Sequence, residues 1–220
     1  MEGIISHKNP KSIIAESVKI LRTNLQFSNV DGNLKTVMVT SSVPGEGKTF
    51  TSSNLAVAFA QLGMKVLVVD CDMRRGTQHK QFMVTNTNGL SDLLIDPNPD
   101  FIKYIKPTNI DGLFVITAGT VPPNPSELLS SKKFDTFISY VRDNYDMIIL
   151  DMPPVTVVPD AAIVATKADK TVIVSRIKVT PMEELEKTKK MLENVNANIA
   201  GVVVNGVKTS GKKYYGKYYN

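Results

Sequence analysis

The chain has 220 residues, of which 42% are hydrophobic and 21% charged, a balance that excludes a disordered or fibrous protein and fits one globular domain. One cysteine excludes an internal disulfide, and neither a secretory signal nor an apolar run of roughly 18 residues is present, so we expect a cytoplasmic protein that reaches a membrane only through a partner. Four lysines and no acid follow Gly206 and carry most of the net charge of +5, so we expect no nucleic-acid-binding face on the folded domain.

Predicted strands alternate with predicted helices along the chain. Apolar residues at helical spacing predict an amphipathic helix from Pro10 to Phe27. Further helices are predicted at residues 48–62, 132–142, 160–166 and 182–195, and strands at residues 36–40, 65–70, 113–117, 147–151, 172–175 and 199–204. This alternation indicates a doubly wound α/β fold with a mostly parallel sheet and helices on both faces, and a glycine-rich loop after the first strand makes it one of the P-loop NTPase type. Ligands of such folds bind beyond the carboxyl ends of the strands, where three motifs lie.

The first motif is a glycine-rich loop, Ser41–Thr49 (SSVPGEGKT), between the first predicted strand and a helix. In a P-loop, main-chain N–H groups surround phosphates, a lysine reaches the β and γ oxygens, and a hydroxyl binds Mg²⁺. The standard pattern has a glycine where Ser42 stands, and a plain glycine turn is the simpler alternative. The strand-loop-helix context favours ATP binding by Pro44, Gly45, Glu46, Gly47, Lys48, Thr49 and Phe50.

Two of the other predicted strands end in aspartates. One strand ends in Asp70-Cys71-Asp72, where alternation places the two acids on one side and the cysteine in the core. Another ends in Asp151, the form of a Walker B strand. We expect Thr49, Asp72 and Asp151 to hold Mg²⁺ and Asp70 or Asp72 to accept a proton as the catalytic base. For Asp70 and Asp72, the alternative is that they are solvated loop acids capping the next segment.

With these motifs the chain resembles the bacterial tyrosine kinases of the capsule and exopolysaccharide type over nearly its whole length. The resemblance rests on the PGEGKT loop, the DxDxR segment Asp70–Arg74, the Walker B strand, the stretch Gly119–Leu129 and the tyrosine-rich C-terminal end. It implies a transmembrane activator, the polysaccharide co-polymerase, that holds the chain at the inner face of the membrane. It also implies a cognate tyrosine phosphatase and ATP-dependent autophosphorylation at Tyr214, Tyr215, Tyr218 and Tyr219.

The resemblance further implies homo-oligomeric rings through a Glu-x-x-Arg-x-x-Arg motif, which reads Glu16-x-x-Lys19-x-x-Arg22 here. Lysine keeps the charge of the middle position but lacks the guanidinium fork of arginine, and a solvated helix flank is the alternative. Accordingly, we divide the chain into an oligomerisation segment (residues 1–33), an ATP-binding kinase core (34–206) and an autophosphorylation tail (207–220).

The tail places four of the seven tyrosines among lysine and glycine, a composition typical of an exposed, flexible segment. From Asn205, Tyr214 could reach about 30 Å when extended, far enough for the site of a neighbouring subunit. Four phosphates would add a charge of about −6 to −8 and invert the charge of the tail. The alternatives are a solubilising end or a segment that stacks on nucleic acid.

Three functions remain open from the residues. A tyrosine autokinase that regulates polysaccharide synthesis is favoured by the tail and by Val43, which stands where partition and division-site ATPases carry a lysine. An ATP-hydrolysing switch protein and a nucleotide-binding scaffold are the alternatives. In the kinase hypothesis Lys48→Met removes most activity and leaves the fold intact. Asn205 is either an adenine-binding residue, as the matching asparagine is in related ATPases, or a simple turn residue. For Arg74 and Arg75 the alternatives are a role in neutralising phosphates, a contact with another subunit, or a plain surface position.

Overall fold

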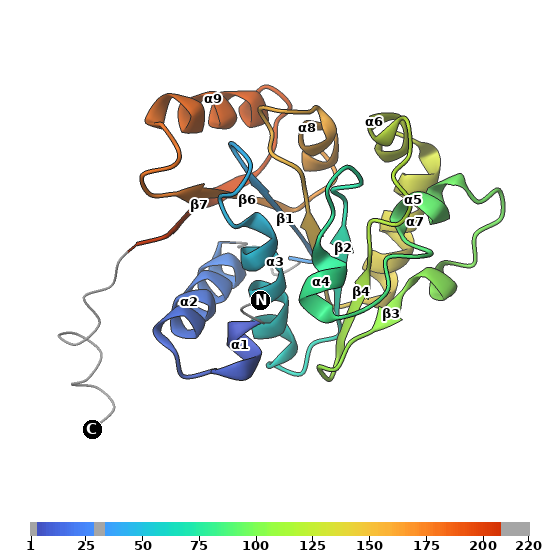
Figure 1. Cartoon of the computed structure of the whole chain (residues 1–220), viewed down its shortest axis with the longest axis horizontal. Coiled ribbons are helices and arrows are strands. Elements are labelled where there is room, and N and C mark those ends of the chain that lie inside the picture. Colours follow the sequence, from blue (N-terminus) through green and yellow to red (C-terminus); the bar gives the residue numbers. More distant parts are fainter. Residues whose placement is uncertain (1–3, 29–33, 208–220) are drawn as a thin grey trace.

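The computed structural model describes residues 4–28 and 34–207, and it shows one seven-stranded sheet between two layers of helices (Figure 1). In sheet order the strands are β3 (Lys106–Pro107), β4 (Leu113–Ile116), β2 (Val66–Asp70), β5 (Met147–Asp151), β1 (Thr36–Ser41), β6 (Lys170–Arg176) and β7 (Ile199–Asn205). Neighbouring strands are parallel, except that β3 runs antiparallel to β4. The predicted, mostly parallel α/β fold is confirmed.

Helices cover both faces of the sheet (Figure 1). One core lies under α1 (Ile5–Lys8), α2 (Ile13–Phe27), α3 (Lys48–Ala60) and α4 (Gln78–Phe82). The other lies under α5 (Leu90–Ile95), η1 (Phe101–Tyr104), α6 (Pro125–Leu129), α7 (Lys132–Asn144), α8 (Asp160–Ala165) and α9 (Met182–Glu193). Helix α3, which begins at the glycine-rich loop, is buried along almost its whole length. The predicted phosphate loop is therefore anchored in the centre of the molecule.

Strand alternation decides which face of the sheet each acidic residue meets. In β2, Val66 and Val68 belong to the core beneath α3, whereas Leu67 and Val69 belong to the opposite core. The same alternation directs Asp70 toward α3 and Cys71 into the opposite core, as the sequence predicts. Asp151 is paired in register with Asp70 on the adjacent strand β5. Two acids thus lie side by side at the carboxyl ends of central strands.

The structure differs from the predictions mainly at short elements. Helix α2 begins at Ile13 rather than Pro10, because the hydroxyl of Ser12 accepts a hydrogen bond from the N–H of Ala15 and caps the helix. Among the helices of six residues or fewer, α8 was predicted, whereas α1, α4, α5, α6 and η1 were not, and neither was the two-residue strand β3, since such short runs carry little periodicity. Within the described ranges, no helix combines the length and the apolar character that crossing a bilayer requires.

Candidate active site

The glycine-rich loop turns sharply between β1 and α3. Gly45 and Gly47 have φ values of +85° and +94°, a backbone conformation that favours glycine. A Cβ on Gly47 would lie 2.6 Å from Nδ2 of Asn205, so this glycine is also required by close approach. Pro44 and Gly45 are exposed at the tip of the loop, whereas Phe50 is half-buried in the first turn of α3.

Glu46 holds the loop from within. Its side chain is 1% exposed and accepts a hydrogen bond from the N–H of Val43 at 2.7 Å and another from the hydroxyl of Thr180. Asn205, at the end of β7, donates to the carbonyl oxygen of Glu46 at 3.0 Å. Arg176 donates to the carbonyl oxygen of Gly45 at 3.2 Å. The loop is thereby tied to the segment between β6 and α9, a role of Glu46 that its position in the sequence does not reveal.

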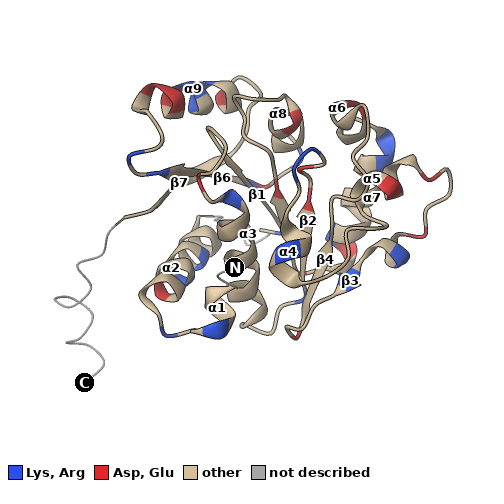
Figure 2. Cartoon of the chain, viewed as in Figure 1, with Lys and Arg blue, Asp and Glu red and all other residues tan. Residues whose placement is uncertain are grey.

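Lys48 and Asp72 form an ion pair in which Nζ and Oδ2 are 2.9 Å apart. The two side chains are only 14% and 6% exposed. Burial alone would lower the pKa of Lys48, but the charges of nearby carboxylates, Asp151 first among them, outweigh burial and raise that pKa. Lys48 therefore stays positively charged among acidic groups. Figure 2 shows basic and acidic segments facing each other where α3 begins and β2 ends.

Asp70 and Asp151 are fully buried beside this ion pair. Burial and then the charge of Asp151 raise the pKa of Asp70 well above its usual range, and burial raises the pKa of Asp151 as well. Asp151 accepts a hydrogen bond from the hydroxyl of Ser52 at 3.1 Å, and the hydroxyl of Thr49 lies close enough to favour its ionised form. Asp70 is engaged by main-chain N–H groups, including that of Asp72. The structure therefore brings Lys48, Thr49, Asp70, Asp72 and Asp151 together, as the three motifs predict.

A turn that the sequence analysis did not single out closes this group of residues. Gln78, the first residue of α4, donates its side-chain N–H to Asp151 and its main-chain N–H to Asp70, each at 2.9 Å. The hydroxyl of the preceding residue, Thr77, lies 3.3 Å from the hydroxyl of Thr49. No sequence signal marks this turn, because a polar five-residue helix has no apolar repeat.

Arg74 lies away from the phosphate loop and pairs with a buried acid. Its Nε donates to Asp160 at 3.1 Å, and Asp160 is fully buried at the start of α8. Ser126 of α6 also donates to Asp160, at 2.5 Å. Arg74 thus connects the loop after β2 to α6 and α8, and both Arg74 and Arg75 are exposed to solvent.

The predicted oligomerisation residues contact their own chain in α2. Lys19 pairs with Glu16 at 2.8 Å and donates to the carbonyl oxygen of Pro10, while Arg22 donates to the carbonyl oxygen of Ala58 in α3 at 2.9 Å. The four predicted acceptor tyrosines, Tyr214, Tyr215, Tyr218 and Tyr219, lie outside the described residues.

The arrangement fits a magnesium-bound nucleotide. The left-handed glycines, the ammonium of Lys48 and the hydroxyl of Thr49 are the groups with which a P-loop holds phosphates and Mg²⁺. Residues 4–28 and 34–207 contain no cluster of three or more histidine, cysteine or acidic side chains arranged to cage a metal ion. In nucleotide-bound Mg²⁺ sites, one or two carboxylates are joined by other oxygen ligands, including phosphate oxygens and waters.

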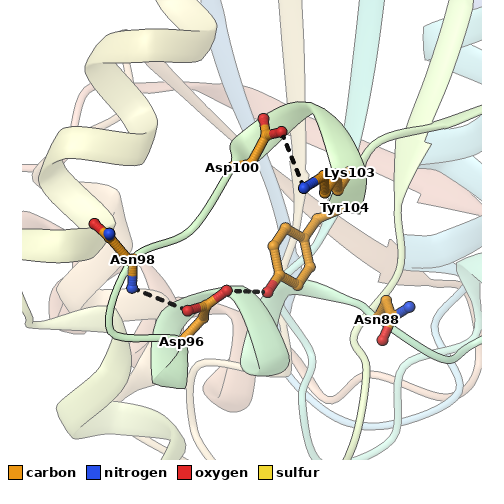
Figure 3. A pocket seen from close by; sticks show the side chains of 6 residues that line it. All are labelled: Asn88, Asp96, Asn98, Asp100, Lys103 and Tyr104. Atoms are coloured by element: carbon orange, nitrogen blue, oxygen red, sulfur yellow. Dashed lines mark hydrogen bonds and ion pairs between the residues drawn. The ribbon is translucent and has the colours of Figure 1, made fainter.

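A small surface pocket of about 210 Å³ lies elsewhere, between α5 and η1 (Figure 3). The hydroxyl of Tyr104 donates to Asp96 at 2.7 Å, which raises the pKa of Tyr104 to about 12. The lining residues are Asn88, Asp96, Asn98, Asp100, Lys103 and Tyr104, so the pocket contains none of the predicted site residues.

Comparison with known proteins agrees with this geometry. A family model described as an AAA domain matches residues 34–202. The tyrosine-protein kinase YwqD of Bacillus subtilis is 40% identical over 216 residues, which cover 98% of this chain and 91% of YwqD. The chain belongs to the bacterial tyrosine kinases. The resemblance inferred from the sequence motifs is thus confirmed.

Solved structures of this family superpose closely on the chain. The chimerical protein CapA2B2 has a TM-score of 0.90 at 38% identity, with 95% of this chain and 92% of that chain covered. The kinase domain of the Escherichia coli tyrosine kinase ETK has a TM-score of 0.87 at 36% identity, with 96% and 84% covered. The full-length Etk sequence is longer, and the chain covers 27% of it. The septum site-determining protein MinD of Pyrococcus horikoshii, solved with Mg-ADP, is 21% identical with a TM-score of 0.65 and shares the fold alone.

Proposed function

We propose that this bacterial tyrosine kinase transfers the γ-phosphoryl group of magnesium-bound ATP to tyrosines of its own C-terminal segment. The observation that carries the proposal is the Lys48–Asp72 ion pair beside Thr49 and Asp151, at the mouth of a glycine-rich loop. Membership of the tyrosine kinase family supports the reaction type.

Different residues around the loop would bind the phosphates, the Mg²⁺ ion and the adenine of the nucleotide. Main-chain N–H groups of residues 44–50 surround the phosphates, and Lys48 neutralises their charge. The hydroxyl of Thr49 with Asp72 and Asp151 would hold Mg²⁺, which would neutralise charge on the phosphate oxygens. Asn205 lies at the end of β7 within reach of the loop, which suits contact with adenine.

Asp72 is the better candidate for the base that accepts the tyrosine proton. Asp70 is fully buried and both of its carboxylate oxygens accept main-chain N–H groups, whereas Asp72 is 4% exposed and only its Oδ1 accepts one, from Arg75. In the transfer, the bond between the γ-phosphorus and the oxygen of ADP breaks, the tyrosine oxygen bonds to phosphorus, and its proton passes to Asp72. Lys48 moves from Asp72 to the phosphates when nucleotide binds, which frees the carboxylate for this step.

An anti-phosphotyrosine assay on the purified chain tests the proposal. We expect phosphotyrosine only when ATP and Mg²⁺ are both present, and we expect Asp72→Asn to lower its formation by about 10²- to 10⁴-fold. Phosphate release without phosphotyrosine would instead identify the ATP-hydrolysing switch. Val43, whose side chain carries no ammonium, argues against that alternative.

The acceptors and the partners follow from the sequence hypothesis. The acceptors are Tyr214, Tyr215, Tyr218 and Tyr219, and phosphorylation inverts the charge of the segment and regulates capsule or exopolysaccharide synthesis. As the family resemblance implies, we propose that a transmembrane activator, the polysaccharide co-polymerase, brings the chain to the inner face of the membrane. A cognate tyrosine phosphatase reverses the modification.

Ring assembly through Glu16, Lys19 and Arg22 remains part of the proposal. Arg22 contributes one N–H to the carbonyl oxygen of Ala58, while its buried Nε has no partner among the described residues. A neighbouring subunit that supplied an acceptor there would satisfy this group. Light scattering of Arg22→Lys tests the assembly, because lysine keeps the charge but cannot make both contacts. An unchanged oligomer would contradict it.

A further inference from the structure

Gln78 joins the ends of two central strands. Its side chain is fully buried, its Nε2 donates to Oδ2 of Asp151, and its main-chain N–H donates to Oδ2 of Asp70. Asp70 and Asp151 are paired in register on β2 and β5. Gln78 therefore fixes the relative position of two carboxylates that no covalent link holds together.

The amide of Gln78 has a defined orientation. Oδ2 of a carboxylate offers only lone pairs, so the NH₂ group must face Asp151 and the carbonyl oxygen, Oε1, must face away from that contact. Oε1 is buried and has no hydrogen-bond partner among the described residues. A buried acceptor without a donor is destabilising, which is a reason to look for a donor that arrives with a ligand.

The turn that carries Gln78 also borders the predicted metal position. The hydroxyl of Thr77 lies 3.3 Å from the hydroxyl of Thr49, and the next residue, Gln78, contacts Asp151, so the segment touches two of the groups that would hold the ion. Mg²⁺ keeps several waters when it binds to proteins, and each of these waters donates hydrogen bonds outward. A metal-bound water is therefore a donor of the right chemistry for a buried amide oxygen at this place.

We propose that Gln78 is a positioning residue for Mg²⁺, in which the amide N–H orients Asp151 and Oε1 accepts a hydrogen bond from a water bound to the ion. This inference rests on the proposed use of a magnesium-bound nucleotide. It adds a fourth chain segment, the turn at residues 77–78, to the three motifs of the site. It also accounts for the complete burial of this polar side chain.

Isothermal titration calorimetry of ADP against the full chain tests the inference without any turnover. Each protein is titrated with saturating Mg²⁺ and with EDTA, and the ratio of the two affinities measures the contribution of the ion. For Gln78→Met we expect this ratio to fall by at least about tenfold, since residues that orient metal ligands typically contribute 10- to 100-fold to metal affinity. The affinity measured in EDTA should be unchanged. Gln81→Met, in the same helix, is the matched control and should keep the ratio of the unsubstituted chain.

Each other outcome has a definite meaning. An unchanged ratio in Gln78→Met overturns the inference, and so does an equal loss of affinity with and without Mg²⁺, which would mark a purely structural residue. If Gln78→Met does not fold, Gln78→Asn takes its place, because its amide is one methylene too short to reach Asp151, and the same loss is expected. If the unsubstituted chain binds ADP equally well with Mg²⁺ and with EDTA, the proposed magnesium-dependent function itself fails, and the inference fails with it.

Discussion

Lys48→Met is expected to destabilise the nucleotide-free protein as well as to abolish phosphorylation. The substitution keeps the aliphatic stem but changes the formal charge of this group from −2, for three carboxylates and one ammonium, to −3. Because Lys48 and Asp72 are 14% and 6% exposed, removing one partner of the pair should lower the free energy of unfolding by about 3–5 kcal/mol. This refines the expectation, made from the sequence, that the fold would be left intact.

The loss of stability should depend on pH. Without Lys48, the buried carboxylates have pKa values further above those of the unfolded chain, so the folded state binds more protons than the unfolded state. Stability then rises as pH falls, and the deficit of the variant should be greatest near about pH 8 and shrink toward about pH 5.

Urea unfolding with EDTA, repeated across this pH range, measures the effect. Asp72→Asn and the double variant complete a thermodynamic cycle, in which we expect a coupling of at least about 1.5 kcal/mol. Lys189→Met is the control, because its ion pair with Glu193 is exposed and should contribute less than about 0.5 kcal/mol. A coupling between Lys48 and Asp72 below about 0.5 kcal/mol would refute the reasoning.

Other substitutions and labels probe the neighbouring residues. Gly47→Ala should lower ADP affinity by about tenfold or more in calorimetry, because its Cβ would displace Asn205 and the left-handed backbone adds about 1–2 kcal/mol of strain. Cys71 should resist thiol reagents in the native protein and react fully in urea, because it is fully buried and burial raises its pKa. Asp160→Ala should lower the free energy of unfolding by about 1–3 kcal/mol in urea, since Arg74 is 40% exposed and can turn to water.

These expectations have clear controls. Gly45→Ala adds similar strain but would meet no atom within 4 Å, so an equal loss of ADP affinity in both variants would remove Asn205 from the explanation. Rapid labelling of Cys71 without urea would show that the core beside β2 opens readily. If Asp160→Ala has the same free energy of unfolding as the unsubstituted chain, the contacts of Asp160 with Arg74 and Ser126 do not stabilise the fold.

The residues at the strand ends could be predicted because each lies at the boundary of a long apolar run. Asp70 and Asp151 close such runs, and parallel strands bring their carboxyl ends to one edge of the sheet. The order of the strands then makes β2 and β5 neighbours, which the sequence does not state. Alternation was enough to direct Cys71 into the core.

The residues that support the site could not be predicted, because their roles arise from contacts between distant segments. Gln78 and Asp151 are 73 positions apart, and Arg74 and Asp160 are 86 apart. Glu46 reads as a loop acid, yet it is buried and accepts a hydrogen bond from Thr180. No local pattern distinguishes such polar residues from solvated ones.

The residues of the site lie partly on central strands and partly on an edge strand, and these strands differ in how readily they open locally. Asp70 and Asp151 end central strands, so their positions are lost only when the whole sheet opens. Asn205 ends the edge strand β7, which is partly exposed along its length and leads directly toward the C-terminal segment. Edge strands exchange their amide hydrogens sooner than central ones. Local fraying of β7 would therefore release the contact of Asn205 with the phosphate loop while Asp70 and Asp151 stay in place.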